Sequence, residues 1–444
     1  MLSEVQDARP KIPQKRGITE KKGMVKAMKQ YTKRITAFFL ALLTVILPLM
    51  LSSCQRNGGK EEILVWVAEE IVDFTRTQCD AFLKENPDIM EKYTIKVSPM
   101  GGGETATQML TDVESGADVY AFAQDQLGRL VQAGALAKLG GTYLSDVKAN
   151  NDEGSVNAVT LGDTIYAYPL TSDNGYFLYY DKRVVKDPST LDGILADCKA
   201  AGKNLYMDNQ SGWYGVSFFF GSGCSYTTET NDKGEIKKVN CDFDSDDGVE
   251  ALRAMVNMAK SGAFQRGDSF ASQFNPDGGR AGAAISGTWD AATIKGYLGE
   301  NYGVAKLPTM TTAEGQEQMS AWAGFKLMGV NPTQSDEAVV VSHKLAAYLT
   351  SESAQLARYN EKGWGPSNKN AQQNEAVQKD EALSALREQL AFSPAQPQCS
   401  ANFWAKMEAL GTEVNAGTYN NYTDDQLEQV LIDLTKYLRA DVVS

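Results

Sequence analysis

The chain has 444 residues, of which 43 are lysine or arginine and 56 are aspartate or glutamate, so its formal net charge is −13. Such an acidic balance repels nucleic acid and anionic lipid surfaces, which excludes both as partners. A chain of this length normally divides into two domains rather than enlarging a single core.

A secretory signal is predicted near the start of the chain. Four cations between residues 26 and 34 precede the apolar stretch Ile35–Met50, which is the layout of such a signal. The stretch contains Pro48 and is short for a membrane span, which needs about 20 apolar residues. The sequence LSSC follows at residues 51–54 and resembles the lipobox of bacterial lipoproteins. This resemblance implies that the peptide before Cys54 is removed and that a lipid on Cys54 anchors the protein at the extracytoplasmic face of the cell membrane.

The sequence before this signal is predicted to be neither targeting nor folded sequence, because its 23 residues hold charges and two prolines without apolar periodicity. Met24 and Met28 each begin a conventional signal, and translation is expected to start at one of them. Residues 1–53 are therefore predicted to be an extension plus a lipoprotein signal peptide, and residues 54–60 a flexible tether. The part after the signal is more acidic still, with 33 basic and 53 acidic residues.

Strand-like and helical segments alternate after the tether. The strand-like runs are Ile63–Val67, Tyr93–Ser98 and Val119–Ala123, and the helical segments are a run to about Glu85, Glu104–Ser115 and Gln126–Ala133. This alternation predicts βαβ units and a parallel sheet. Ligands of such sheets collect beyond the carboxyl ends of the strands, which here are residues 68–70, 99–103 and 124–125.

Neither a metal site nor a nucleotide site is predicted, and no cofactor is expected. His343 is the one histidine and has no second histidine or cysteine beside it, so the spacing typical of zinc ligands is missing. Gly101–Gly103 lacks the GK[ST] ending and the GxGxxG spacing of phosphate loops. We interpret these glycines as a strand-to-helix turn.

Two cysteines flank a predicted β-hairpin. Cys224 and Cys241 are equally spaced from the turn signal Asn231–Gly234, which would place them opposite each other on antiparallel strands, close enough for a disulfide. A bulge in either strand would break this register and leave two free thiols. The sequence leaves both alternatives open.

Four stretches in a consistent order resemble the extracellular solute-binding proteins of sugar ABC importers, especially maltose/maltodextrin-binding proteins. They are ADVYAFAQDQLGRLVQAGALAKL at 117–139, TIYAYPLTSDNGYFLYYDKRVV at 164–185, AAISGTWDAATIKGYLGENYGVAKLPT at 283–309, and SPAQPQCSANFWAKM at 393–407. The resemblance implies an α/β fold of the type II periplasmic-binding-protein kind, in which two lobes of parallel or mixed sheets close by hinge motion around a ligand. Lobe 1 would comprise residues 61–171 with 322–366, and lobe 2 residues 175–317 with 374–444.

The same resemblance implies a set of ligand-binding residues. Asp125 matches an aspartate that hydrogen-bonds sugar hydroxyls, and Asp173 falls at or next to a hinge glutamate, with Asn174 as the alternative. The remaining matches are an acidic residue of the first loop and an aromatic shelf for sugar rings: Glu70, Phe122, Trp213 or Tyr214, Trp289 and Trp404. Gln126 and Ile71 replace an arginine and a lysine of maltodextrin binders, which predicts a hydroxyl pattern different from that of maltose.

The residue chemistry supports a sugar independently of the resemblance. A pyranose has apolar C–H faces and a rim of hydroxyls, so its receptor needs flat aromatic surfaces with carboxylates and amides at the edge. Three or four aromatic rings that each cover roughly 60 Å² would supply about 5 kcal/mol at ~25 cal/mol/Å². A micromolar affinity needs about 8 kcal/mol, so polar contacts must supply the rest.

Each assignment has a structural alternative. Aromatic residues of α/β proteins are more often core than binding surface, and we assign Trp66, Tyr179 and Phe218–Phe220 to the core. Asp125 could instead cap the helix that follows it, which is worth about 1 kcal/mol. Trp364 could line the cleft or brace the hinge, and the sequence does not decide between them.

The leading hypothesis is a monomeric, lipid-anchored receptor without enzymatic activity that delivers an oligosaccharide to an ABC permease. A binder of another solute, such as a polyamine or a peptide, is one alternative, because several of the candidate residues are acidic. An extracellular glycosidase is another, since paired carboxylates beside aromatic rings also describe that chemistry. The sequence does not name the sugar, its length or its linkage.

Overall fold

The computed structural model describes residues 59–444 apart from residues 232, 268–269, 441 and 443–444. The predicted signal, the lipid attachment at Cys54 and the first part of the tether lie outside the described residues. Within the described ranges, none of the helices is both long and apolar enough to cross a membrane.

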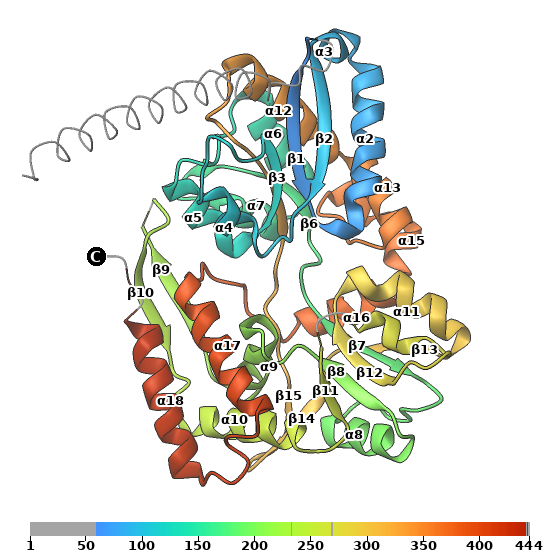
Figure 1. The fold of residues 1–444 in the computed structure, drawn as a ribbon, viewed down its shortest axis with the longest axis vertical. Helices are drawn as coiled ribbons and strands as arrows, with labels where there is room; N and C mark the ends of the chain where they lie inside the picture. Colours follow the sequence, from blue (N-terminus) through green and yellow to red (C-terminus); the bar gives the residue numbers. More distant parts are fainter. Residues whose placement is uncertain (1–58, 232, 268–269, 441, 443–444) are drawn as a thin grey trace, which may run out of the picture. The chain divides into compact units, whose positions relative to one another are not determined.

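The first sheet has five strands in the order β2-β1-β3-β16-β6 (Figure 1). Their bounds are β1 Glu61–Val67, β2 Tyr93–Pro99, β3 Val119–Ala123, β6 Tyr168–Thr171 and β16 Lys326–Val330. The three predicted strands are confirmed as β1, β2 and β3. β3 runs parallel to β1, but β16 is antiparallel to both β3 and β6, so the sheet is mixed rather than purely parallel.

The helices of this first lobe begin with the predicted one, which is confirmed as α2 and ends at Glu85. The helix predicted over Glu104–Ser115 is much shorter, because the Asp112 carboxylate accepts hydrogen bonds from the backbone N–H groups of Glu114 and Ser115 and turns the chain. The elements outside the sheet are η1 Glu69–Ile71, α2 Val72–Glu85, α3 Pro87–Lys92, α4 Thr105–Met109, η2 Gln124–Gln126, α5 Leu127–Gln132, α6 Gly141–Asn150, α7 Glu153–Ala158, β4 Thr160–Leu161, β5 Thr164–Ile165, α12 Asp336–Leu349 and α13 Glu352–Lys362.

The second sheet also has five strands, in the order β11-β8-β12-β7-β13. Their bounds are β7 Phe177–Asp181, β8 Asn204–Met207, β11 Phe264–Arg266, β12 Ala281–Ser286 and β13 Tyr302–Ala305. β8 is parallel to β11 and β12, whereas β7 is antiparallel to β12 and β13. Two hairpins accompany this sheet: β9 Tyr226–Thr230 with β10 Ile236–Cys241, and β14 Thr309–Thr312 with β15 Gly315–Gln318.

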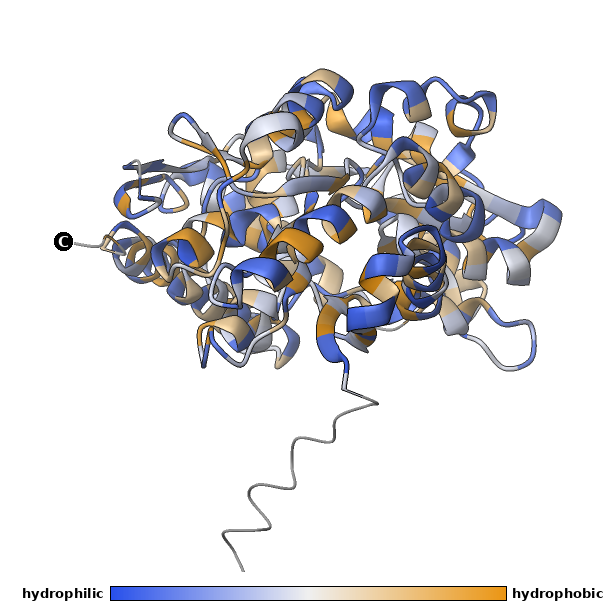
Figure 2. Cartoon of the chain, turned by 90° about the horizontal axis from the view of Figure 1, so that it is seen from above, coloured by the Kyte–Doolittle hydropathy of each residue, from blue (hydrophilic) through white to orange (hydrophobic). Residues whose placement is uncertain are grey.

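The helices of the second lobe include α18, for which the sequence places leucines at helical spacing. Its Leu427, Leu431 and Leu434 are buried, and Thr423 and Gln426 form a capping box at its start. Helices that carry one polar and one apolar face appear in Figure 2 as alternating blue and orange segments. The elements outside the sheets are α8 Leu191–Ala200, α9 Gly212–Gly221, α10 Asp246–Ala259, η3 Ala271–Phe274, η4 Thr288–Asp290, α11 Ala291–Leu298, η5 Gly299–Asn301, α16 Glu381–Leu390, α17 Ala401–Asn415 and α18 Asp424–Arg439.

The chain crosses between the two sheets more than once. It passes from β6 to β7, returns from β15 to β16, and passes from α13 to α16 through the short helices α14 Lys369–Gln372 and α15 Glu375–Gln378. Each sheet has its own apolar core. Trp322, which precedes β16, packs in the core of the second lobe against Phe220 and Phe403.

The predicted opposition of Cys224 and Cys241 is wrong. In the β9–β10 hairpin Cys241 pairs with Tyr226, because a bulge between Ile236 and Lys238 shifts the register. The Cys224 thiol instead lies 3.7 Å from the Ser245 hydroxyl. Both thiols are buried, and neither forms a disulfide.

The tip of this hairpin touches helix α5 of the first lobe (Figure 1). The Gln132 side chain donates a hydrogen bond to the Gly234 carbonyl at 2.7 Å. A Cβ built on Gly234 would come within 2.5 Å of the Gly128 Cα, so the two backbones are in direct contact. Glycine is required at both positions for this approach.

We expect Gly234→Ala to lower the free energy of unfolding more than Gly134→Ala does. Both glycines have a positive φ, +77° and +68°, so each alanine incurs the left-handed cost of about 1–2 kcal/mol. Only the methyl group at 234 also meets another backbone, since nothing lies within 4 Å of a Cβ at 134. Urea unfolding followed by tryptophan fluorescence measures both losses, and equal losses would contradict the backbone contact.

Candidate ligand-binding site

A cavity of about 690 Å³ lies between the two lobes, at the carboxyl ends of β1, β2 and β3. The first lobe supplies the residues that follow these strands, and the second lobe supplies three of the aromatic side chains. The lining residues are Ala68–Ile71, Pro99–Glu104, Ala121–Ala123, Asp125, Leu170, Asn174, Ser211, Trp213, Trp289, Lys326, Trp364, Gln396 and Trp404.

Flat aromatic surface is the main feature of this cavity. Four of the six tryptophans line it together with Phe122. The rings of Trp213 and Trp289 are 6.0 Å apart between centroids, with their planes inclined at 36°. Trp404 is fixed from behind by edge-on contacts with Trp322 at 5.9 Å and with its neighbour Phe403 at 4.9 Å. The indoles therefore have defined orientations set by packing.

The sequence left open whether Trp364 lines the cleft or braces the hinge, and the structure supports both roles. It lines the cavity, and it is also part of the first lobe's core with 2 % of its surface exposed. The next residue, Gly365, donates its backbone N–H to Asp173 at 2.6 Å. Trp364 therefore connects the cavity wall to a crossing segment between the lobes.

The glycine turn after β2 is held in place by Gln126. The Gln126 side chain donates to the Gly102 carbonyl at 2.5 Å and accepts from the Ala106 N–H at 2.7 Å. The prediction that Gly101–Gly103 forms a strand-to-helix turn is confirmed, and these glycines also line the cavity. Gln126 thus supports the wall and lies behind it.

Asp125 is an acidic group in an almost dry position, with 6 % of its surface exposed. Burial raises the pKa of its carboxyl to about 7, and the charge of Arg129 and a hydrogen bond from Trp404 only partly oppose this rise. The alternative role as a helix cap is wrong, because neither η2 nor α5 has a side-chain cap. Its carboxyl group lines the cavity, where it can accept a hydrogen bond from a ligand when ionised and donate one when protonated.

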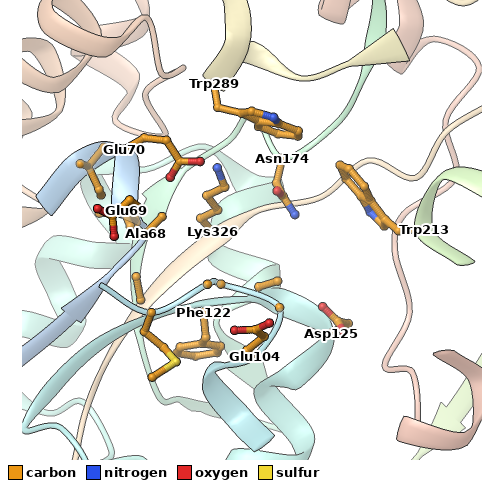
Figure 3. A pocket seen from close by; sticks show the side chains of 18 of the residues that line it. Ala68, Glu69, Glu70, Glu104, Phe122, Asp125, Asn174, Trp213, Trp289 and Lys326 are labelled. Carbon is orange, nitrogen blue, oxygen red and sulfur yellow. The ribbon is translucent and has the colours of Figure 1, made fainter. Parts of the chain in front are cut away.

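Lys326 lines the cavity although the sequence analysis did not single it out. Its ammonium nitrogen lies 3.8 Å from the ring centroid of Trp364 and 4.8 Å from that of Trp289, which are cation–π distances. Figure 3 shows the side chain extending between Glu70 and Asn174 toward Trp289. Burial lowers the pKa of this ammonium group, while the charges of Asp173 and Glu70 oppose the shift. The sequence did contain a signal for this residue, because Lys326 is the first residue of an otherwise apolar strand.

The structure brings six of the eight predicted binding residues to the cavity: Glu70, Phe122, Asp125, Trp213, Trp289 and Trp404. Asp173 and Tyr214 do not line it. The Asp173 carboxylate is turned to Thr288 and Gly365, and its neighbour Asn174 lines the cavity instead. Tyr214 packs against Tyr176, with ring centroids 4.7 Å apart. The sequence offered Asn174 as the alternative to Asp173 and Trp213 as the alternative to Tyr214, and Asn174 and Trp213 are the residues that line the cavity.

Known proteins resemble this chain over most of its length. A family model described as bacterial extracellular solute-binding protein matches residues 77–385. The chain belongs to this family. The galactooligosaccharide-binding protein of Bacillus subtilis (strain 168) is 26% identical over 362 residues, which cover 78% of this chain and 82% of that protein.

Solved structures agree with this membership in the solute-binding family. A structure described as a complex with acarbose has a TM-score of 0.75 and 31% sequence identity, and the match covers 86% of this chain and 99% of the other. The maltodextrin binding protein MalE1 from L. casei BL23 without ligand has a TM-score of 0.70 and 25% identity, with coverage of 86% and 99%. The predicted family resemblance and the two-lobe α/β fold are both confirmed. The predicted lobe boundaries remain a prediction.

Within the residues that the structure describes, no group of three or more histidine, cysteine or acidic side chains could hold a metal ion. His343 stacks on Tyr143 at 5.7 Å, and its Nδ1 lies 2.9 Å from the Tyr168 hydroxyl. Burial lowers the pKa of its imidazole. This histidine therefore serves packing in the first lobe.

We expect the stability of the wild type to fall relative to Asp125→Asn as the pH rises from 5 to 8. The folded state holds the Asp125 proton up to about pH 7, whereas an unfolded aspartate loses it near pH 3.9. The resulting stabilisation is complete below about pH 4 and is lost as the pH rises through 7. Urea unfolding at four pH values measures the difference between the two proteins.

Asp163→Asn is the control for this experiment, because it changes an exposed carboxylate in the same lobe. Its curve of stability against pH should run parallel to that of the wild type. Parallel curves for Asp125→Asn as well would show that Asp125 is ionised normally in the folded state.

Proposed function

We propose that this solute-binding protein takes an oligosaccharide into the cavity between its lobes and delivers it to an ABC permease. The observation that carries the proposal is the combination of four indoles and a phenyl ring with carboxylates and amides around a cavity of about 690 Å³. Sugar rings present apolar faces to the former and hydroxyls to the latter.

Hydrogen-bond acceptors surround the aromatic surfaces. Glu69, Glu70, Glu104 and Asp125 line the cavity as carboxylates. The side-chain oxygen of Gln396, which also lines the cavity, is buried without a hydrogen-bond partner. A buried acceptor in this state is costly, and a hydroxyl that donates to it relieves that cost. The polar rim therefore favours a ligand with many O–H donors.

The similar proteins support a sugar ligand but differ in the sugar. Their descriptions name galactooligosaccharide, acarbose and maltodextrin. Gln126 and Ile71 remove the two donors that maltodextrin binders are expected to carry, while Lys326 and Asn174 place other donors at the cavity. We propose an oligosaccharide whose hydroxyl pattern differs from that of maltose.

Binding without hydrolysis is the second part of the proposal. Of the two predicted aspartates, Asp125 and Asp173, only Asp125 lines the cavity, because the Asp173 carboxylate accepts hydrogen bonds from Thr288 and Gly365, so these two do not form a catalytic pair there. Incubation with oligosaccharides should release no reducing ends. Anchoring through a lipid on Cys54 and an extracytoplasmic location are further parts of the proposal, and they rest on the sequence of residues 26–54 and on the family. A monomeric state completes the proposal.

A ligand panel tests the function. Thermal shift and calorimetry with maltotetraose, a galactose trisaccharide, acarbose and spermidine should give a response to at least one saccharide. A ligand at a hundred times its Kd adds about 2.7 kcal/mol to the stability. A response to spermidine alone would replace the sugar proposal with a polyamine receptor.

We expect Trp213→Ala and Trp404→Ala each to weaken saccharide binding by about 10-fold, because a ring that covers roughly 60 Å² of sugar contributes about 1.5 kcal/mol. Trp404→Phe keeps a flat surface and should lose less than Trp404→Ala. Calorimetry gives the Kd values with whichever saccharide binds the wild type.

Trp66→Phe is the control for both, since Trp66 packs on the first lobe's core and is not among the lining residues. Its Kd should equal that of the wild type. Unchanged affinity in both alanine variants would remove the stacking role of these indoles.

A further inference from the structure

The carboxylate of Asp173 joins segments of the chain that belong to different lobes. Asp173 lies on the crossing from β6 to β7, and 2 % of its surface is exposed. Its Oδ2 accepts a hydrogen bond from the Thr288 hydroxyl and another from the Gly365 N–H, each at 2.6 Å. Thr288 follows β12 of the second sheet, whereas Gly365 follows α13 of the first lobe. One oxygen atom therefore ties together three segments.

Two buried cations of the first lobe face the same carboxylate. Burial lowers the pKa of Lys326 and of Arg358, the latter to about 10, and the negative charge of Asp173 opposes both shifts. Arg358 is also held by the carbonyl groups of Leu349 and Leu170. Gly365 of the first lobe also donates to Asp173, so this hydrogen bond and the charges of Lys326 and Arg358 all attract the carboxylate toward the first lobe.

Thr288 is the partner on the second lobe, and it directly precedes a residue of the cavity. The turn that carries it is fixed within its own lobe, because the Tyr179 hydroxyl donates to the Gly287 carbonyl at 2.7 Å and Ser286 donates to Asp290 at 2.6 Å. The Trp289 indole folds back over Gly287 and faces the Lys326 ammonium group. The position of Thr288 therefore determines where Trp289 meets the first lobe.

We propose that Asp173 is a positioning residue that latches the two lobes: its bond to Thr288 holds the second lobe, and Trp289 with it, against the first. The latch acts without contact to the ligand, because neither Asp173 nor Thr288 lines the cavity. Its effect on sugar affinity rests on the proposed function, whereas its effect on lobe closure does not. Loss of the bond favours the open form, so a ligand that touches both lobes must supply the missing interaction.

Substitution of Thr288 tests the latch. Thr288→Val removes the hydroxyl and keeps the shape, and Thr288→Ser keeps the hydroxyl. Small-angle X-ray scattering without sugar should give a larger radius of gyration for Thr288→Val than for the wild type, and a wild-type value for Thr288→Ser. The Kd for maltotetraose and for acarbose should rise by about the same factor, ~10-fold, in Thr288→Val alone.

Thr435→Val is the matched control, because it removes another fully buried threonine hydroxyl of the second lobe, one without a hydrogen-bond partner. It should change neither the radius nor the affinity. Asp173→Ala, which removes the acceptor oxygen itself, provides a second variant if Thr288→Val does not fold, and it should also enlarge the radius.

Specific outcomes overturn the latch. A wild-type radius in Thr288→Val, or an equal increase in Thr288→Ser or Thr435→Val, shows that the hydroxyl bond does not hold the lobes. An enlarged radius with unchanged Kd shows that the bond is not coupled to the ligand. If the wild type binds no saccharide, the proposed function fails, while the scattering comparison still decides whether Asp173 latches the lobes.

Discussion

The arrangement of the cavity depends on charges buried where the chain crosses between its sheets. Lys326 opens β16, an inner strand of the first sheet, and Arg358 of α13 donates a hydrogen bond to the Leu170 carbonyl of the neighbouring strand β6. Neither ammonium nor guanidinium can be removed from water at this position without a counter-charge. Asp173 supplies a counter-charge to both from a crossing segment. The crossing is therefore held by electrostatics as well as by chain connectivity.

The electrostatic arrangement also determines what the aromatic surfaces can do. Lys326 occupies the faces of Trp289 and Trp364 that are turned toward it, so these faces are not free for a sugar ring unless the lysine moves. Trp213 and Trp404 also line the cavity, and within the described residues no cation lies over either ring. Stacking on these two rings is then consistent with a lysine that donates hydrogen bonds to hydroxyls of the same ligand.

The sequence predicted the elements whose pattern is local. β1, β2 and β3 alternate with helices, and β1 and β3 carry continuous apolar runs. The positions of these strands, and the edge of the sheet at which ligands bind, could therefore be predicted from the sequence. Three of the six correctly predicted cavity residues, Glu70, Phe122 and Asp125, lie in or beside these elements, and the other three are tryptophans of the second lobe that followed from the family resemblance. The antiparallel pairing of β16 with β3 was not predictable in this way, because the two strands come from distant parts of the chain.

The misassignments share a physical cause, which is that side-chain direction depends on tertiary partners. Asp173 and Asn174 are adjacent, and only the hydrogen bonds from Thr288 and Gly365 decide which of them turns away from the cavity. The pairing of Cys224 with Cys241 failed because one bulge displaced the register. Lys326 had a visible signal in its apolar strand, but its meaning required two indoles that lie far away in sequence.

Two inter-lobe contacts of different character accompany the cavity. At the hairpin tip, Gly234 meets Gly128 through backbone atoms alone, and a glutamine adds one hydrogen bond. At the crossing, a charged oxygen accepts two short hydrogen bonds among buried cations. The first contact is sensitive to volume, since a single methyl group would separate the backbones, while the second is sensitive to hydrogen bonding and charge. A ligand that bridges the lobes adds its own contacts to both, so its affinity reflects the strength of these protein contacts as well as the sugar surface that the tryptophans cover.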